Sequence, residues 1–410
     1  MLHVKEQPRQ PPVLERALAQ YWRDHGASLP PLECDDGSRL RVLYAGRASS
    51  AAGPDFRDAV LQREGGEVVR GDVELHLRRG GWEAHGHHTD RGYDGVVLHM
   101  VLHGGDTPIT LASGRRVPTA SLFPRTLGRR SRREAPTPRP LPLASLPASA
   151  SRLGRTLDRE GDARFFEKVR GFARALRQAE PSETLYAGLM GGLGYGGNSG
   201  PMTRLAEGMP LRALERALRG VPDGGRRDAL ASALVRASGL ASGDGDSGVQ
   251  AVEPVLARGE WKLFRVRPSN HPSRRLMGMA ALLDRAWDAG LAGWAATLVA
   301  TGSVAEVRAG LTVAGDGPGG ALVGADRASD LAVNVVLPFA RAWGNVVRDA
   351  GIAAAALGLY RAWPSLQENS VTAEAARLLG GEGKELRRSA RRQQGLIRVY
   401  RRGLGGDVAG

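Results

Sequence analysis

Six of the nine histidines in this chain fall within one stretch, from Gly53 to His103. The acids Asp55 and Glu74 lie in the same stretch, beside apolar runs that are typical of strands. Imidazole and carboxylate are the side chains that hold divalent metals and transfer protons in many hydrolases. The sequence therefore predicts that any chemistry of this protein takes place here.

The first strand-like segment of the stretch runs from Asp72 to Leu77, where every second residue is polar. Successive side chains of a strand point to opposite faces. Asp72, Glu74 and His76 therefore share one face of this predicted strand, and its apolar residues form the other.

A second segment, VVLHMVLH, repeats the pattern. Its alternation predicts one apolar face of Val96, Leu98, Met100 and Leu102 and a second face that carries His99. If the two strands are neighbours, their second faces form one polar platform. We expect the histidine-rich loop between them to close over this platform.

The order of acids resembles, at a distance, the core of PD-(D/E)XK nucleases. Pro54-Asp55 precedes one predicted strand and Glu74-Leu75-His76 lies on the next. The resemblance implies that Asp55, Glu74 and His76 are catalytic, and that Mg²⁺ or Mn²⁺ activates water for attack on a phosphodiester. His76 stands where that family has a lysine, and the segment that follows is short for the family's helix.

Histidine ligands offer a second interpretation, in which Zn²⁺ or another transition metal is held by nitrogen and carboxylate. The candidate ligands from both interpretations lie in the one stretch: Asp55, Asp72, Glu74, His85, His87, His88, Asp90 and His99. Two further alternatives remain open. The polar groups can form a hydrogen-bond network that only stabilises the fold, or the protein can bind nucleic acid without cleaving it.

The composition narrows the class of protein. The chain has 410 residues, a net charge of +14 and a pI near 10.7, which predicts an affinity for polyanions such as DNA or RNA. Its only cysteine, Cys34, excludes disulfides within the chain and zinc sites built from several cysteines. We expect a cytoplasmic protein that makes no membrane contact, and the sequence leaves its oligomeric state open.

The hydrophobic pattern predicts an α+β protein. Residues 1–125 combine a helix with a mixed or antiparallel sheet, and residues 158–410 read as mainly α-helical. Between them, residues 126–157 are rich in arginine and proline, which is typical of a linker.

One turn in the helical half is unusually polar. The sequence RVRPSNHP places Arg265, Arg267, Asn270 and His271 around two prolines. These residues are suited either to helix capping or to binding an anion together with the N-terminal site. We name them as candidate substrate-binding residues.

Several longer motifs resemble an uncharacterised bacterial family of unknown function. They are AGPDFRDAV, GDVELHL, Trp82 with HGHHTD and YDGVVLHMVLH, VPTASL, RPSNHPSRR, NVVLPFARAW and ARRQQGLIRVYRR. They follow in order along nearly the whole chain. The resemblance implies a shared architecture and supplies no activity.

Overall fold

The computed structural model describes residues 13–49, 52–104, 108–122, 150–194, 197–241, 252–263, 266–315, 320–379 and 384–403. The chain divides into two compact units. The first comprises Met1–Leu146, Ala373–Gly380 and Tyr400–Gly410, and the second comprises Pro147–Thr372 and Gly381–Val399. A sheet in the first unit and helices through most of the second confirm the predicted α+β class.

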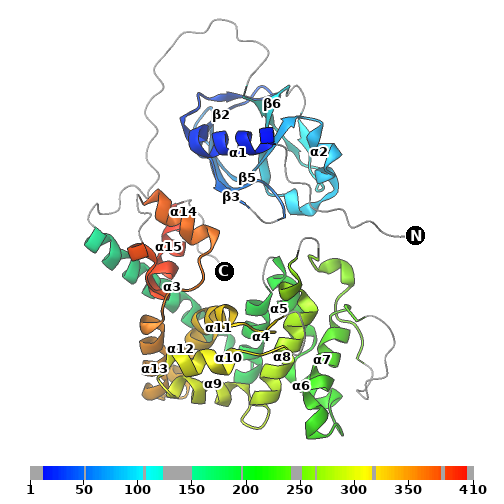
Figure 1. Cartoon of the computed structure of the whole chain (residues 1–410), viewed down its shortest axis with the longest axis vertical. Helices are drawn as coiled ribbons and strands as arrows, with labels where there is room; N and C mark the ends of the chain where they lie inside the picture. Colours follow the sequence, from blue (N-terminus) through cyan, green and yellow to red (C-terminus); the bar gives the residue numbers. More distant parts are fainter. Residues whose placement is uncertain are drawn as a thin grey trace, which may run out of the picture. The chain divides into compact units, whose positions relative to one another are not determined.

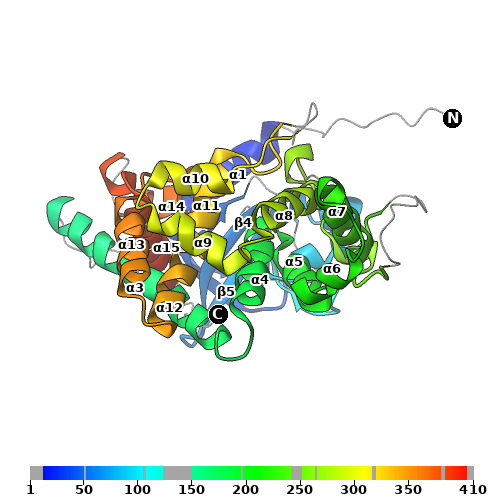
Figure 2. The ribbon, with the colours of Figure 1, turned by 90° about the horizontal axis from the view of Figure 1, so that it is seen from below.

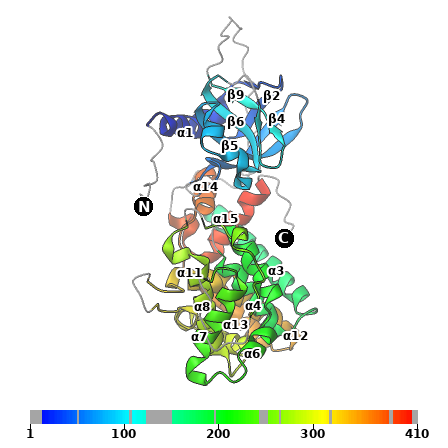
Figure 3. The ribbon, with the colours of Figure 1, turned by 90° about the vertical axis from the view of Figure 1, so that its right-hand side faces the viewer.

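The first unit is built on a seven-stranded mixed sheet of order β1-β2-β4-β5-β6-β9, with β3 paired to β4 (Figures 1 and 3). The strands are β1 (Leu32–Glu33), β2 (Arg39–Tyr44), β3 (Arg47–Ala48), β4 (Phe56–Arg63), β5 (Val68–Arg78), β6 (Val96–His103) and β9 (Thr119–Ser121). Strands β2, β4 and β5 run antiparallel, whereas β6 is parallel to β5 and β9 is parallel to β6. The two strands with the polar alternation are therefore neighbours.

Helix α1 (Val13–His25) lies across one face of this sheet (Figure 1). Leu18 and Trp22 of α1 are buried in one apolar cluster with Val73 of β5 and Leu98 of β6. The Trp22 indole Nε1 donates a hydrogen bond of 2.9 Å to the Ala45 carbonyl. The apolar alternation of the strands thus faces α1, which leaves the polar side chains on the opposite face.

The opposite face is covered by the crossover between β5 and β6. It contains α2 (Gly81–Ala84) and the short 3-10 helices η2 (His87–Thr89) and η3 (Arg91–Tyr93), and the hairpin β7 (Ile109–Thr110) and β8 (Arg116–Val117) follows β6. Trp82 and Tyr93 form a second buried cluster here, which Val96 joins. Val96 was predicted to share a face with Leu98, but the pairing of β5 with β6 shifts by one residue between them and turns Val96 to the other side.

The second unit is helical and has one large core, which includes Leu189, Leu282 and Tyr360. Its first helices are α3 (Ala150–Ala175), α4 (Pro181–Leu193), α5 (Ser199–Gly208), α6 (Leu211–Ala217), α7 (Arg226–Ala237) and α8 (Pro272–Ala286). They are followed by α9 (Leu291–Ala300), α10 (Val304–Leu311), α11 (Ala325–Leu331), the π-helix η9 (Ala332–Val336), α12 (Leu337–Val346), α13 (Ala350–Ala362) and most of α15 (Ala390–Gly403). Most of α14 (Ser370–Leu378) and the end of α15 from Tyr400 belong to the first unit. In this unit α12 packs against α3 and α13, and α7 packs against α8 (Figure 2). Within the described ranges no helix is both long and apolar enough to cross a membrane.

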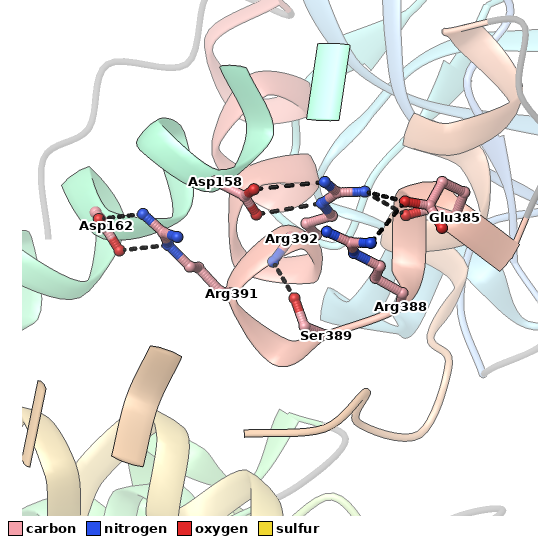
Figure 4. Close-up of polar contacts among 7 residues, drawn as sticks. All are labelled: Asp158, Asp162, Glu385, Arg388, Ser389, Arg391 and Arg392. Carbon is pink, nitrogen blue, oxygen red and sulfur yellow. Dashed lines mark hydrogen bonds and ion pairs between the residues drawn. The ribbon is translucent and has the colours of Figure 1, made fainter. Parts of the chain in front are cut away.

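Ion pairs join α3 to the start of α15 (Figure 4). Asp158 pairs with Arg392 at 3.2 Å and Asp162 pairs with Arg391 at 2.5 Å. The backbones approach closely as well, because a Cβ on Gly161 would lie only 2.9 Å from the carbonyl carbon of Arg391. Helix α3 begins at Ala150, so the last residues of the predicted linker are helical instead; the prolines that prevent a helix end at Pro147. The rest of that linker lies outside the described residues.

Candidate functional site

Strands β5 and β6 bring three buried polar side chains together. In their parallel register Glu74 lies opposite His99, and His76 lies two residues further along β5 on the same face. The residues Glu74, His76 and His99 are 5 %, 2 % and 0 % exposed. His76 Nδ1 lies 2.9 Å from His99 Nε2, and His99 Nδ1 lies 3.3 Å from the Thr119 hydroxyl on β9. The polar platform predicted from the alternation is therefore present.

The crossover adds two more imidazoles. His85 Nδ1 lies 3.0 Å from His76 Nε2, and His87 Nε2 lies 3.2 Å from Glu74 Oε1. Gly86 between them has φ +74°, a left-handed conformation that a glycine adopts without strain. Tyr93 stacks on the His87 ring at 3.9 Å between ring centroids, which fixes its orientation.

The resulting constellation, named the metal group below, consists of His76, His85, His87 and Glu74. One nitrogen from each histidine lies within 4.8 Å of the other two, so these side chains could hold a metal ion. Glu74 Oε1 lies 3.9 Å from His76 Nε2. Tetrahedral zinc with bonds of about 2.0–2.1 Å requires ligand atoms about 3.3–3.4 Å apart. Three of the separations, 3.0, 3.2 and 3.9 Å, bracket that distance. The three histidine nitrogens as a set lie within 4.8 Å of one another, so a bound zinc ion would draw them closer together.

The hydrogen bonds behind His76 suit a role as a ligand. If Nε2 of His76 binds a metal, its Nδ1 carries the proton and donates to His99 Nε2. His99 then carries its own proton on Nδ1 and donates it to the Thr119 hydroxyl. A chain of this kind fixes the tautomer and the orientation of a ligating histidine.

Asp55 lies directly beside Glu74, and these two residues are named the carboxyl pair. The Asp55 N–H donates to Glu74 Oε2 at 3.0 Å, and the Leu75 N–H donates to Asp55 Oδ2 at 3.1 Å. Burial, and then the Glu74 charge, raises the pKa of Asp55 to about 7. Burial raises the pKa of Glu74 to about 8, against the opposing effect of the Asp55 N–H, and Glu15 on α1 raises it further.

The two buried imidazoles are disfavoured as cations. Burial, then the neighbouring His99, lowers the pKa of His76 to about 2, and burial, then Arg79, lowers that of His99 to about 3. Two buried carboxyls with raised pKa values and two buried imidazoles that stay neutral thus share one site. Strongly shifted pKa values of this kind are characteristic of functional sites.

Three other predicted ligands lie apart from the metal group. His88 and Asp90 are exposed, and Asp90 accepts a hydrogen bond of 2.7 Å from the Gly92 N–H at the start of η3. His87 and His88 are consecutive in a 3-10 helix, where neighbouring side chains point about 120° apart, so only one of them can face Glu74. Asp72 instead pairs with Arg57 at 3.3 Å.

The polar turn of the second unit is occupied largely by capping contacts. Asn270 Oδ1 accepts a hydrogen bond of 2.6 Å from Arg275, and His271 Nδ1 accepts one of 3.4 Å from the Ser273 N–H at the start of α8. Arg267 is exposed, and Arg265 lies outside the described residues. Anion binding by this turn stays a prediction.

The sequence did not indicate two residues of this polar face, Thr119 and Arg57. Its spacing could have indicated Arg57, because Arg57 follows Asp55 by two residues in the motif GPDFRD. Thr119 lies in VPTASL, where nothing in the residue types distinguishes it from an ordinary strand residue.

No curated protein and no solved structure is significantly similar to this chain. A family model described as "Protein of unknown function (DUF2851)" matches residues 15–222, a span that includes α1 from Glu15 onward, the whole sheet and every member of the metal group. The match confirms the resemblance to an uncharacterised family that the sequence motifs indicated. The chain belongs to the family of proteins of unknown function DUF2851.

Proposed function

We propose that this protein is a divalent-metal-dependent hydrolase that cleaves phosphodiester bonds of nucleic acids. The observation that supports the proposal best is the position of Asp55 and Glu74. Asp55 directly precedes β4, and Glu74 lies on β5, the antiparallel neighbour of β4. The two residues are joined by hydrogen bonds through Asp55 N–H and Leu75 N–H, and Glu74 lies beside three imidazoles. Two neighbouring carboxyls can hold a divalent metal ion, which activates water for attack on phosphate.

Each side chain has a role in this proposal. A bound metal would polarise a phosphoryl oxygen and lower the pKa of water at the site. Glu74 and His76 would hold and orient the metal. Asp55, whose pKa lies near neutrality, is suited to accept a proton from the attacking water. The order of elements, with Glu15 on α1, Asp55 before β4 and Glu74-x-His76 on β5, also follows the PD-(D/E)XK resemblance.

The donor atoms favour zinc over magnesium. Three of the four groups offer imidazole nitrogen, which suits Zn²⁺ and other late transition metals, whereas Mg²⁺ prefers six oxygen ligands. Mg²⁺ or Mn²⁺ would have to rely on the carboxyl pair. The net charge of +14 supports a polyanionic substrate, because a basic surface raises the local concentration of nucleic acid.

A structural role for the metal is the second candidate function, and the number of ligands supports it. If Glu74 and all three imidazoles bind one zinc ion, the tetrahedral shell is complete and no position remains for water. The metal would then tie the crossover to β5 and stabilise the fold without catalysis. Removing zinc would lower the thermal stability of such a protein strongly, whereas a catalytic metal would be needed mainly for cleavage.

Paired variants test the proposal. Cleavage of single-stranded and duplex DNA and RNA is measured in Zn²⁺, Mn²⁺ and Mg²⁺, with metal content determined for every protein. Glu74→Gln should abolish cleavage while Glu67→Gln, an exposed position on the same hairpin, should leave it unchanged. His87→Ala should lose metal while His88→Ala keeps it.

Equal behaviour within either pair would contradict the assignment of the metal group. A protein that binds zinc through His87 and Glu74 but cleaves no phosphodiester would favour the structural candidate.

A further inference from the structure

A β-bulge lies next to the metal group. In the pairing of β4 with β5, Phe56 is opposite Val73 and Ala59 is opposite Gly71, which leaves Arg57 and Asp58 together opposite Asp72. Asp58 has φ +65°, a left-handed conformation that costs a non-glycine residue about 1 kcal/mol or more. Bulges and strained residues of this kind often redirect a side chain beside a functional site.

The bulge places Arg57 on the polar face of the sheet. Arg57 is the cross-strand neighbour of Asp72, and Asp72 precedes Glu74 by two residues on the same face.

The guanidinium is held loosely. Its Nη1 lies 3.3 Å from Asp72 Oδ2 and its Nη2 lies 3.4 Å from the Ala52 carbonyl, both longer than the 2.7–2.9 Å of a good charge-assisted hydrogen bond. The side chain is 32 % exposed, whereas that of Asp72 is only 14 % exposed. Donors remain for a further acceptor, because arginine has five N–H groups in a planar fork.

The backbone leaves room for this side chain. Gly53 has φ +113°, and a Cβ there would overlap Nη2 of Arg57. A glycine is therefore required at the point where the motif GPDFRD folds back over its own arginine.

An anion that approaches the metal group meets several carboxyls. Asp55, Asp58, Asp72 and Glu74 all lie along this part of β4 and β5. They would repel a phosphate unless cations offset them. Arg57 is a cation at this face, and its planar fork matches two phosphate oxygens at once.

We propose that Arg57 binds the phosphate of the substrate and positions it against the metal group. This inference rests on the proposed phosphodiester substrate and adds a residue that recognises it. Arg57 acts by holding a non-bridging phosphate oxygen, and Asp72 keeps the guanidinium directed along the polar face until substrate replaces part of that contact.

Inorganic phosphate is the probe for the test. Its dissociation constant is measured by calorimetry on the zinc-loaded full-length protein and on four variants: Arg57→Ala, Arg57→Lys, Asp72→Asn and Arg63→Ala. Arg63 lies on the same strand and is 48 % exposed near the far end of the hairpin, so it serves as the matched control. The zinc content of each protein is determined alongside, which separates loss of phosphate from loss of metal.

Arg57→Ala should weaken phosphate binding about tenfold to hundredfold, the usual value of a charge-assisted hydrogen bond. Arg57→Lys should fall between Arg57→Ala and wild type, and Arg63→Ala should match wild type. Asp72→Asn should bind phosphate as tightly as wild type or more tightly, because it releases the guanidinium and removes a negative charge.

Three results would overturn the inference: phosphate binding by Arg57→Ala as in wild type, an equal loss in Asp72→Asn and Arg57→Ala, or no phosphate binding by wild type at millimolar concentration. The middle result would show that Arg57 only holds the bulge. If Arg57 governs phosphate binding but the protein cleaves no nucleic acid, the inference stands and the proposed reaction fails.

Discussion

Replacing Gly81 by alanine should damage the metal group through a single methyl group. A Cβ on Gly81 would lie 2.7 Å from Cγ of His76, whereas an ordinary contact is 3.4–4 Å. The adjacent Gly80 has open space around its own virtual Cβ and a helical backbone with φ −63°. Gly80→Ala is therefore a control that differs by one position and carries the same chemical change.

The size of the effect follows from the overlap. The difference between 2.7 and 3.4 Å for Cγ requires His76 to move by at least about 0.7 Å, because its Cδ2 would lie closer still. Functional metal sites keep ligand distances within about 0.2 Å. We expect metal affinity to fall about tenfold to hundredfold, as when the support of a ligand is lost. Overpacking beside the buried ring should also cost about 1–3 kcal/mol of unfolding free energy.

The assay is a zinc titration against a competing chelator, with thermal unfolding of the metal-free proteins in parallel. The thermal data show what fraction of each protein is folded, so that reduced zinc binding is not confused with unfolding. If Gly81→Ala binds zinc as tightly as Gly80→Ala does, His76 is not a ligand and the metal group is wrongly assigned.

Three further predictions concern stability. In urea unfolding, Gly161→Ala should lower the unfolding free energy by about 1–3 kcal/mol, because the added methyl group separates α3 from α15. Gly171→Ala, in open space on the same helix, should raise the unfolding free energy by about 0.5–1 kcal/mol. Arg392→Ala should cost about 1–3 kcal/mol, because it removes a buried arginine and leaves the partly exposed Asp158 without this partner. Arg388→Ala, at an exposed position, should cost less than about 1 kcal/mol. Equal losses in the two variants would contradict the role of Arg392 in holding α15. The raised pKa values of the carboxyl pair mean that the folded metal-free protein binds more protons than the unfolded chain does. Its unfolding free energy should therefore fall by about 1–2 kcal/mol from pH 6.5 to 8. The zinc-loaded protein should show no such fall, and a rise in the metal-free protein would refute these pKa shifts.

The polar face of the site could be predicted because strand alternation is fixed by covalent geometry. The spacing of Glu74 and His76 on β5 and of His99 on β6 was enough to place these three side chains together. The bulges could not be predicted. One extra residue at Asp58, and the shift that separates Val96 from Leu98, are determined by which ladder hydrogen bonds form in the folded sheet.

The choice among the loop histidines also required the structure. His85, His87 and His88 are equivalent by residue type, and the direction of each depends on Gly86 and on the short helix η2. Packing against Tyr93 then selects His87. Such choices come from tertiary contacts, which residue spacing does not contain.

The division of the chain into two units could be predicted only in part. The proline-rich segment predicted where the sheet and helices separate, but nothing in the sequence indicated that residues 373–380 and 400–410 belong to the first unit. They are held there by hydrogen bonds over long sequence separations, such as the 2.8 Å bond that the Tyr44 hydroxyl donates to Glu374. Local patterns carry no information about pairs that lie so far apart.

We propose that a metal bound beside Glu74 makes this protein a phosphodiesterase. The most direct measurement is cleavage of a DNA or RNA strand by the full-length protein, freed of metal and then titrated with Zn²⁺ or Mn²⁺, for wild type and Glu74→Gln. Wild-type cleavage should rise with metal and reach a plateau near one ion per chain, while Glu74→Gln should stay folded and inactive. Cleavage by Glu74→Gln at the wild-type rate, or no cleavage by the metal-loaded wild type, would contradict this proposal.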